Sequence, residues 1–206
     1  MNSKLAATSL TFAFAASLAV AANVDARPFK VAPDAHSETM ATFTSKAAIV
    51  RLSGRTTKVD GEGTINVDKP SLNPTGTVTI DVASFDTGIP LRNEHMRGMI
   101  EAEKYPTATF TMKSMKAPKL VAQQPVDGTV TGEMTFHGVT RTVTAPVTLV
   151  YLPEQDKNYR PGDWVSVTTG FKLKLTDYGI KLPAAVLGVK VADELSVEVE
   201  GMAKGL

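Results

Sequence analysis

The chain has 206 residues, of which 43% are hydrophobic, with 22 Lys and Arg against 21 Asp and Glu. A formal net charge of +1 argues against a nucleic-acid-binding or polybasic membrane-surface protein, because both classes rely on a concentrated positive field. The absence of cysteine excludes disulfides, thiolate nucleophiles and zinc-cysteine or iron-sulfur sites.

The N-terminus has the pattern of an export signal. Lys4 precedes an uncharged, Ala-rich stretch over residues 5–22, and cleavage after Ala22 or after Ala26 fits the preference for small residues. An uncleaved anchor is the alternative, although the run is near the lower length for a membrane span. We expect residues 1–26 to be a signal peptide and the remainder a periplasmic protein with no integral membrane span.

Weak two-residue periodicity predicts several short strands in the first half of the mature chain. One segment departs from this pattern: from Pro90 to Lys104 the apolar residues do not alternate, and Pro90 suits the first position of a helix. We predict one or two short helices there. The expected strands are Glu38–Phe43, Ala48–Arg55, Gly61–Val67, Gly76–Ala83 and Ala108–Met115.

Alternation is stronger in the second half of the chain. Strands are predicted at Gly128–Phe136, Thr142–Leu152, Val165–Leu175 and around Leu195–Val199. The residues at 137–139 between the first two predict a tight hairpin, in which Gly138 supplies a positive φ. About nine antiparallel strands can form a sandwich or a closed barrel, and no linker divides residues 27–206, so one all-β domain is expected.

Few residues suggest catalysis or metal binding. The three histidines, His36, His95 and His137, are too far apart in the sequence to form a recognisable metal motif. Asp34, His36 and Ser37 invite comparison with a catalytic triad, but one turn cannot align nucleophile, base and orienting group. No nucleophile elbow of the G-x-S-x-G type occurs. We therefore predict no catalytic residues, no metal and no cofactor.

One set of motifs is more specific. It consists of Asp81–Gly88, Arg92–Arg97, Glu103–Phe110 and Gly132–Thr140, with Asp34–Ser37 before them and Asp177–Ile180 after them. In order and spacing these motifs closely resemble the YceI-like family of exported polyisoprenoid-binding proteins, over about residues 29–203. The resemblance implies a lipocalin-like antiparallel β-barrel of about eight strands, capped at one end by one or two short helices. It also implies an isoprenoid lipid or isoprenoid quinone inside the barrel, and homodimerisation as a family expectation.

The sequence departs from the family pattern between His95 and Lys104, where the family usually carries an aromatic residue and one or two extra residues. A shorter cap is therefore expected. Asn93 stands where the family commonly has Asp. Met96 stands where the family commonly has Leu, and the flexible Met side chain makes the wall of the ligand site more adaptable.

A mostly apolar inner face makes the inward residues candidates for ligand contact. Plain core packing is the alternative for each of them. Arg92 and His95 are candidates either for binding a polar head group or for anchoring the cap to the barrel, and we favour anchoring. A filled structural barrel without a ligand, or a hydrolase, are the rival functions. The apolar candidates are Phe43, Phe110, Met112, Val130, Met134, Phe136, Val147, Leu149, Phe171 and Leu173.

Overall fold

The computed structural model describes residues 25–32 and 39–206. The predicted signal segment up to residue 24, including the cleavage position after Ala22, lies outside the described residues. The same holds for the Asp34, His36 and Ser37 group and for the start of the strand predicted at Glu38. Within the described residues no helix has the length and apolar character needed to cross a membrane.

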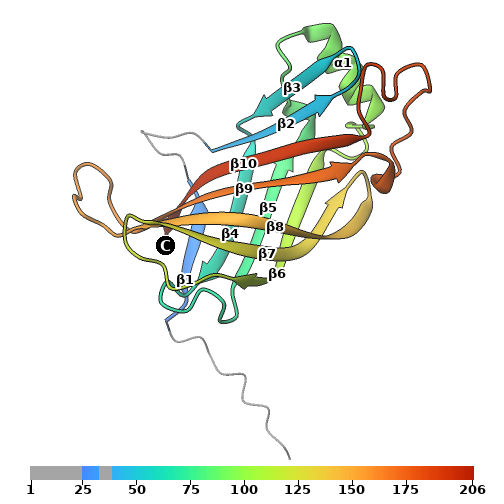
Figure 1. Ribbon diagram of the computed structural model, residues 1–206. Coiled ribbons are helices and arrows are strands. Elements are labelled where there is room, and N and C mark those ends of the chain that lie inside the picture. Colours follow the sequence, from blue (N-terminus) through green and yellow to red (C-terminus); the bar gives the residue numbers. More distant parts are fainter. Residues whose placement is uncertain (1–24, 33–38) are drawn as a thin grey trace, which may run out of the picture.

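Eight antiparallel strands close into a barrel (Figure 1). The closure comes from β1, which pairs with β4 on one side and with β10 on the other. Every other neighbouring pair in the barrel is also antiparallel. In spatial order the strands are β1 (Arg27–Val31), β4 (Val59–Ile65), β5 (Thr75–Asp81), β6 (Thr107–Lys116), β7 (Pro125–Phe136), β8 (Val139–Leu152), β9 (Trp164–Lys174) and β10 (Glu194–Gly205).

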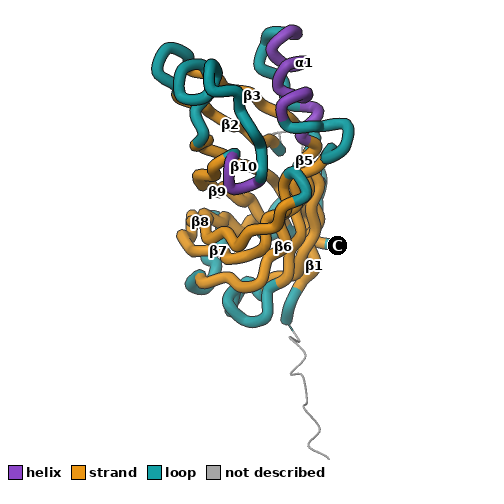
Figure 2. The backbone as a smooth tube through the Cα atoms, turned by 90° about the vertical axis from the view of Figure 1, so that its right-hand side faces the viewer, coloured by secondary structure: helices purple, strands orange, loops and turns teal. Residues whose placement is uncertain are grey.

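Two further strands leave the barrel wall. β2 (Met40–Lys46) pairs with the first half of β10, and β3 (Arg51–Thr56) pairs with β2. The hairpin they form stands at the same end of the barrel as α1 (Pro90–Met99), as both views show (Figures 1 and 2). Two single-turn 3-10 helices, η1 (Val82–Ser84) and η2 (Thr176–Tyr178), follow β5 and β9 at this end. We call it the cap end.

The alternation predicted for the strong strands is confirmed. Along β7, Val130, Met134 and Phe136 are buried, whereas Thr129 and Thr135 are exposed. The predicted hairpin is also confirmed, because His137 and Gly138 have φ values of 50° and 73°. Positive φ at both central residues is the geometry that matches the twist of the flanking strands.

The weaker predictions differ from the structure in their boundaries and number. Sequence reasoning missed β1, because only Phe29 and Val31 of its five residues are apolar and Pro28 interrupts the pattern. The strand expected to begin at Ala48 begins at Arg51, and residues 47–50 form the hairpin tip. The helix ends at Met99, with turns continuing to Lys104, so there is one α-helix in this segment.

Candidate functional site

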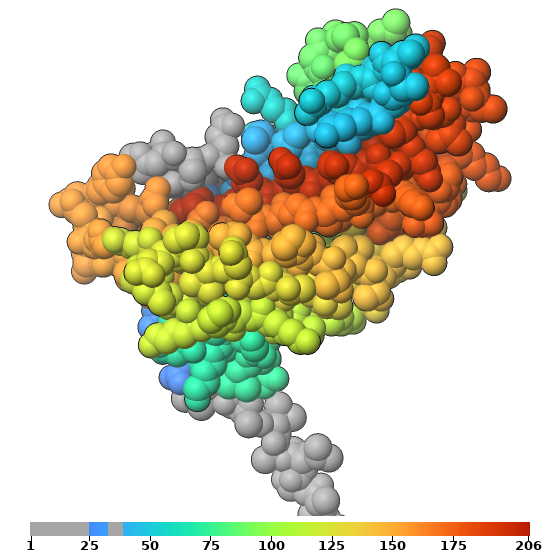
Figure 3. All heavy atoms as spheres, viewed as in Figure 1, coloured from blue at the N-terminus to red at the C-terminus, as the bar shows by residue number. Residues whose placement is uncertain are grey.

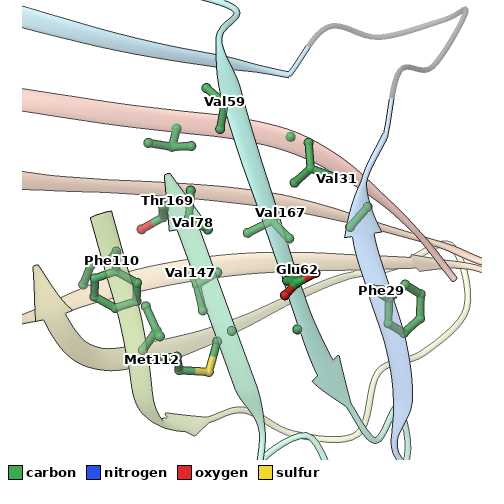
Figure 4. Close-up of a pocket in the computed structure, with 18 of the residues that line it drawn as sticks. Phe29, Val31, Val59, Glu62, Val78, Phe110, Met112, Val147, Val167 and Thr169 are labelled. Carbon is green, nitrogen blue, oxygen red and sulfur yellow. The ribbon is translucent and has the colours of Figure 1, made fainter. Parts of the chain in front are cut away.

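The barrel encloses an apolar space that we call the barrel cavity, with a volume of about 240 Å³. All eight barrel strands contribute to its lining. Figure 4 labels some of these side chains, among them Phe29, Phe110 and Val167. The lining is aliphatic and aromatic because inward positions alternate with outward polar positions on every strand. Among the residues that the structure describes, Glu62 is the only charged one at its border. It is exposed and lies on β4 between Gly61 and Gly63, which face inwards.

Two facing glycines form part of the wall of the barrel cavity. Gly63 of β4 lies directly opposite Gly76 of β5, and both border the barrel cavity. A Cβ on Gly63 would stand 2.3 Å from the Thr75 carbonyl oxygen, so no larger residue fits there without moving backbone. The Met112 side chain lies over this part of the wall, with its Cε 3.1 Å from where a Cβ on Gly76 would stand.

A second space, the cap cavity, lies at the cap end with a volume of about 420 Å³. Its walls come from the β2–β3 hairpin, from α1, from the connection between η2 and β10, and from those parts of the barrel strands that lie at the cap end. The lining is again mostly apolar, but it includes Ser45, Arg92, His95 and Lys190. No carboxylate lines it among the described residues, so its fixed charge is positive.

The two cavities are adjacent inside the barrel and share four lining residues. Ile80, Ala108, Met134 and Val197 line both of them, from β5, β6, β7 and β10. We call these four residues the waist. The waist separates a mostly apolar chamber from one whose apolar lining also carries polar side chains from β2, α1 and the η2–β10 connection. This arrangement suits an amphiphilic ligand.

Every residue predicted from the sequence to contact a ligand lines one of these cavities. The structure brings Arg92 and His95 together on one face of α1, as their three-residue spacing requires. Whether these side chains touch a ligand stays a prediction. Around the barrel cavity lie Phe110, Met112, Val130, Met134, Val147, Leu149 and Phe171, and around the cap cavity lie Phe43, Met134, Phe136, Leu173, Arg92 and His95.

Asn93, which lies beside Arg92, makes the side-chain hydrogen bonds that hold the start of α1 to the connection before it, and anchoring by Arg92 or His95 stays a prediction. Its side-chain oxygen accepts hydrogen bonds from the Thr87 N–H at 2.9 Å and the Thr87 hydroxyl at 2.6 Å. Its amide nitrogen donates to Asp86 at 2.7 Å. This bond and one from the Gly88 N–H hold the pKa of Asp86 below its usual value. Among the described residues no side-chain hydrogen bond ties Arg92 or His95 to the barrel; Arg92 is half-buried and His95 is exposed.

Sequence reasoning overlooked this network, and it also overlooked Lys190 and Ser45. Asp86 and Thr87 just before a proline-initiated helix were the available signal for the Asn93 contacts. Ser45 is fully buried, and its hydroxyl accepts a hydrogen bond from the Ala192 N–H at 2.9 Å. This bond fixes the segment that carries Lys190. No local pattern marks either residue, because both reach the cavity through pairings with distant segments.

His137 holds segments of the cap end together. Its Nδ1–H donates to the Tyr178 carbonyl oxygen at 2.9 Å, and its ring packs on Tyr105 with 4.6 Å between ring centroids. These contacts join the β7–β8 turn to η2 and to the segment after α1. Across the described part of the chain, no three His, Asp or Glu side chains gather where they could hold a metal ion.

Comparison with known sequences decides the family. Residues 29–203 match the YceI-like domain, which is nearly the whole described chain. The chain belongs to the YceI-like family. It is 34% identical over 154 residues to a UPF0312 protein of Pseudomonas aeruginosa, covering 73% of this chain and 74% of that protein. It is 32% identical over 152 residues to Protein YceI of Escherichia coli, covering 69% of this chain and 71% of that protein.

Two solved structures share the fold. The Burkholderia cenocepacia protein BcnA aligns with a TM-score of 0.65 at 25% identity, over 81% of this chain and 96% of that one. A polyisoprenoid-binding domain from Saccharophagus degradans, implicated in plant cell wall breakdown, aligns with a TM-score of 0.63 at 19% identity, over 86% of this chain and 98% of that one. The predicted lipocalin-like antiparallel barrel of eight strands is thereby confirmed.

Proposed function

We propose that this YceI-like protein is a non-catalytic carrier that holds a lipid with an isoprenoid tail inside its barrel. The observation that carries the proposal is the apolar lining of the barrel cavity by all eight strands, next to a cap cavity that shares the four waist residues with it. The resemblance to a domain described as polyisoprenoid-binding supports the choice of tail. A methyl-branched hydrocarbon chain requires a cavity that is wide enough for its branches and lined by apolar side chains. It requires no hydrogen bond from the protein.

The energetics favour such a ligand. Burying apolar surface contributes about 0.8 kcal/mol per CH₂-sized group, and association costs about 4–15 kcal/mol. A tail of a few isoprene units therefore offsets the cost of association without any ion pair. Because this attraction is non-directional, we expect selection by the length and width of the tail more than by its chemistry.

We further propose that the protein works in the periplasm, for storage or transport. The sequence pattern of residues 1–26 supports export, and an extracytoplasmic carrier would keep an insoluble lipid from aggregating between membranes. A fusion of residues 1–26 to a reporter enzyme that is active only after export tests this part separately.

Native mass spectrometry of the purified mature protein tests the carrier function, followed by organic extraction and titration with a polyisoprenoid. A bound lipid mass, or saturable uptake of the added polyisoprenoid, is expected. A clean apo mass together with no uptake would overturn the carrier proposal and favour a filled structural barrel.

A matched pair of variants links uptake to the waist. Ala108→Leu adds a bulky side chain where the two cavities meet, so it should reduce uptake in a protein that remains folded. Ala122→Leu makes the same change at an exposed position in the β6–β7 connection and should leave uptake unchanged. Equal uptake by both variants would contradict ligand passage through the waist.

A further inference from the structure

Five large aliphatic side chains are exposed around the rim of the cap cavity. Ile49, at the tip of the β2–β3 hairpin, is 72% exposed, and Leu91, in the first turn of α1, is 60% exposed. Ile89, Leu187 and Val189 complete the set. The hairpin tip and the η2–β10 connection are joined directly, since the N–H groups of Ala48 and Ile49 donate to the carbonyl oxygens of Gly188 and Val189.

Positive charge accompanies these aliphatic residues. Residues 46–51, 87–99 and 181–192, which we call the rim segments, carry six Lys and Arg side chains and one carboxylate, Glu94. Asp86 and Asp193 border the segments and are engaged in hydrogen bonds, with Asn93 and Thr176 respectively. Further acidic residues lie next to these segments: Glu101 and Asp177 lie towards the β7–β8 turn, beside His137 and Arg141, Glu103 follows in the turn after α1, and Glu194 pairs with Lys172. Figure 3 shows the hairpin, α1 and the connection that follows β9 gathered at one end of the molecule.

The opposite end of the barrel provides an internal comparison. Its connections, residues 66–74, 117–124 and 153–163, also expose apolar side chains such as Leu72 and Val121. They carry four cationic and four acidic residues, with ion pairs between Lys119 and Asp68 and between Lys157 and Glu154. Among the described residues the six rim cations form no ion pair. The net charge of +1 for the whole chain therefore conceals a local concentration of positive charge at the cap end.

We propose that the cap end docks on an anionic lipid bilayer, with the rim cations on the head groups and the exposed aliphatic side chains in the interface. Basic residues beside apolar side chains are the combination that binds such surfaces, because each supplies part of an otherwise weak attraction. Docked in this way, the cap cavity faces the membrane, and a lipid enters or leaves the barrel without crossing water. The proposal goes beyond the carrier function and does not depend on the identity of the cargo.

Vesicle co-sedimentation of the mature protein tests this surface, using vesicles of phosphatidylglycerol and of phosphatidylcholine. Stronger binding to phosphatidylglycerol, weakened by salt, is expected. The double variant Arg97→Glu/Lys181→Glu should reduce binding by about tenfold or more, whereas Lys157→Glu at the opposite end should have a much smaller effect. Ile49→Ser/Leu187→Ser should also reduce binding, and Val121→Ser should not.

None of the substituted residues lines either cavity, so uptake of an added polyisoprenoid should be unchanged in all of these variants. That readout separates the docking surface from the carrier function. Equal binding to the two kinds of vesicle, or equal losses for rim and opposite-end variants, would overturn the docking proposal and leave the carrier proposal standing. A rim variant that loses uptake but keeps its vesicle binding would also overturn the docking proposal.

Discussion

The ring of Phe110 on β6 lies over Gly132 on the neighbouring strand β7. A Cβ at Gly132 would stand 2.4 Å from Phe110 Cζ and 2.4 Å from the Thr111 carbonyl oxygen. Gly132 therefore supplies the space that Phe110 occupies at the wall of the barrel cavity. Because one of the two contacts is with backbone, a rotamer change of Phe110 alone would not make room for a side chain.

Gly132→Ala should lower the free energy of unfolding by about 1–3 kcal/mol, the usual cost of overpacking. Gly170→Ala on β9 is the matched control, because its Cβ would meet its nearest neighbour at an ordinary 3.6 Å. Replacing a strand glycine at such a site should be neutral or slightly stabilising. Urea unfolding of both variants measures the difference, and equal losses would contradict the proposed role of Gly132.

Phe136→Asp should abolish ligand uptake, whereas Thr135→Asp should not. Phe136 is 7% exposed and lines the cap cavity, while the neighbouring Thr135 points outwards and exchanges a hydrogen bond of 2.8 Å with Thr140. A carboxylate is costly to bury in an apolar cavity and costs little in water. Polyisoprenoid titration, restricted to variants with native circular dichroism, provides the comparison. The milder Met134→Gln serves if Phe136→Asp fails to fold, and full uptake by Met134→Gln would then contradict the assignment.

Asn93→Ala should lower the melting temperature of the ligand-free protein, whereas Arg92→Ala and His95→Ala should leave it nearly unchanged. Asn93 holds the start of α1 through Thr87 and Asp86, and an unpaired partly buried polar group costs about 1–3 kcal/mol. Arg92 and His95 line the cap cavity, so their removal should act on ligand release instead. Differential scanning calorimetry of the three apo variants separates the two roles. A larger loss for Arg92→Ala than for Asn93→Ala would restore the anchoring interpretation.

Stability should depend on the ionisation of Asp163, which links β1 to the β8–β9 connection. Partial burial acts to raise the pKa of Asp163, but bonds from the Glu154 N–H and the Tyr151 hydroxyl, and the Arg27 charge, outweigh it and lower the pKa. A lowered folded-state pKa means that this stabilisation is present above the unfolded-state pKa of about 3.9 and is lost as the pH falls through the folded-state value.

Asp163→Asn should therefore destabilise the protein at neutral pH, by about 1 kcal/mol because Arg27 is half-exposed. The difference from the unsubstituted protein should shrink below about pH 4 as Asp163 itself becomes protonated. Asp156→Asn, in the same connection, is the control, since Asp156 accepts a local hydrogen bond from the Asn158 N–H. Thermal melts across pH give the result, and a difference that does not change with pH would contradict the ionic role.

The sequence by itself determined which side chains face inwards on the long strands. The inward order Val130, Met134, Phe136 and the turn at His137–Gly138 could be predicted because side-chain alternation and turn geometry are local properties. The same local pattern selected apolar residues that all border a cavity. It failed for β1, where charges and a proline obscure the period in a strand of five residues.

Only the tertiary structure decided how those faces enclose space. Closure by β1, the departure of β2 and β3 from the barrel wall, and the meeting of two cavities at Ala108 and Met134 all depend on pairings between distant segments. The clustering of rim cations in a chain of nearly zero net charge arises in the same way. Strand order and the convergence of loops are set by the packing of the whole barrel, and a local period contains no information about them.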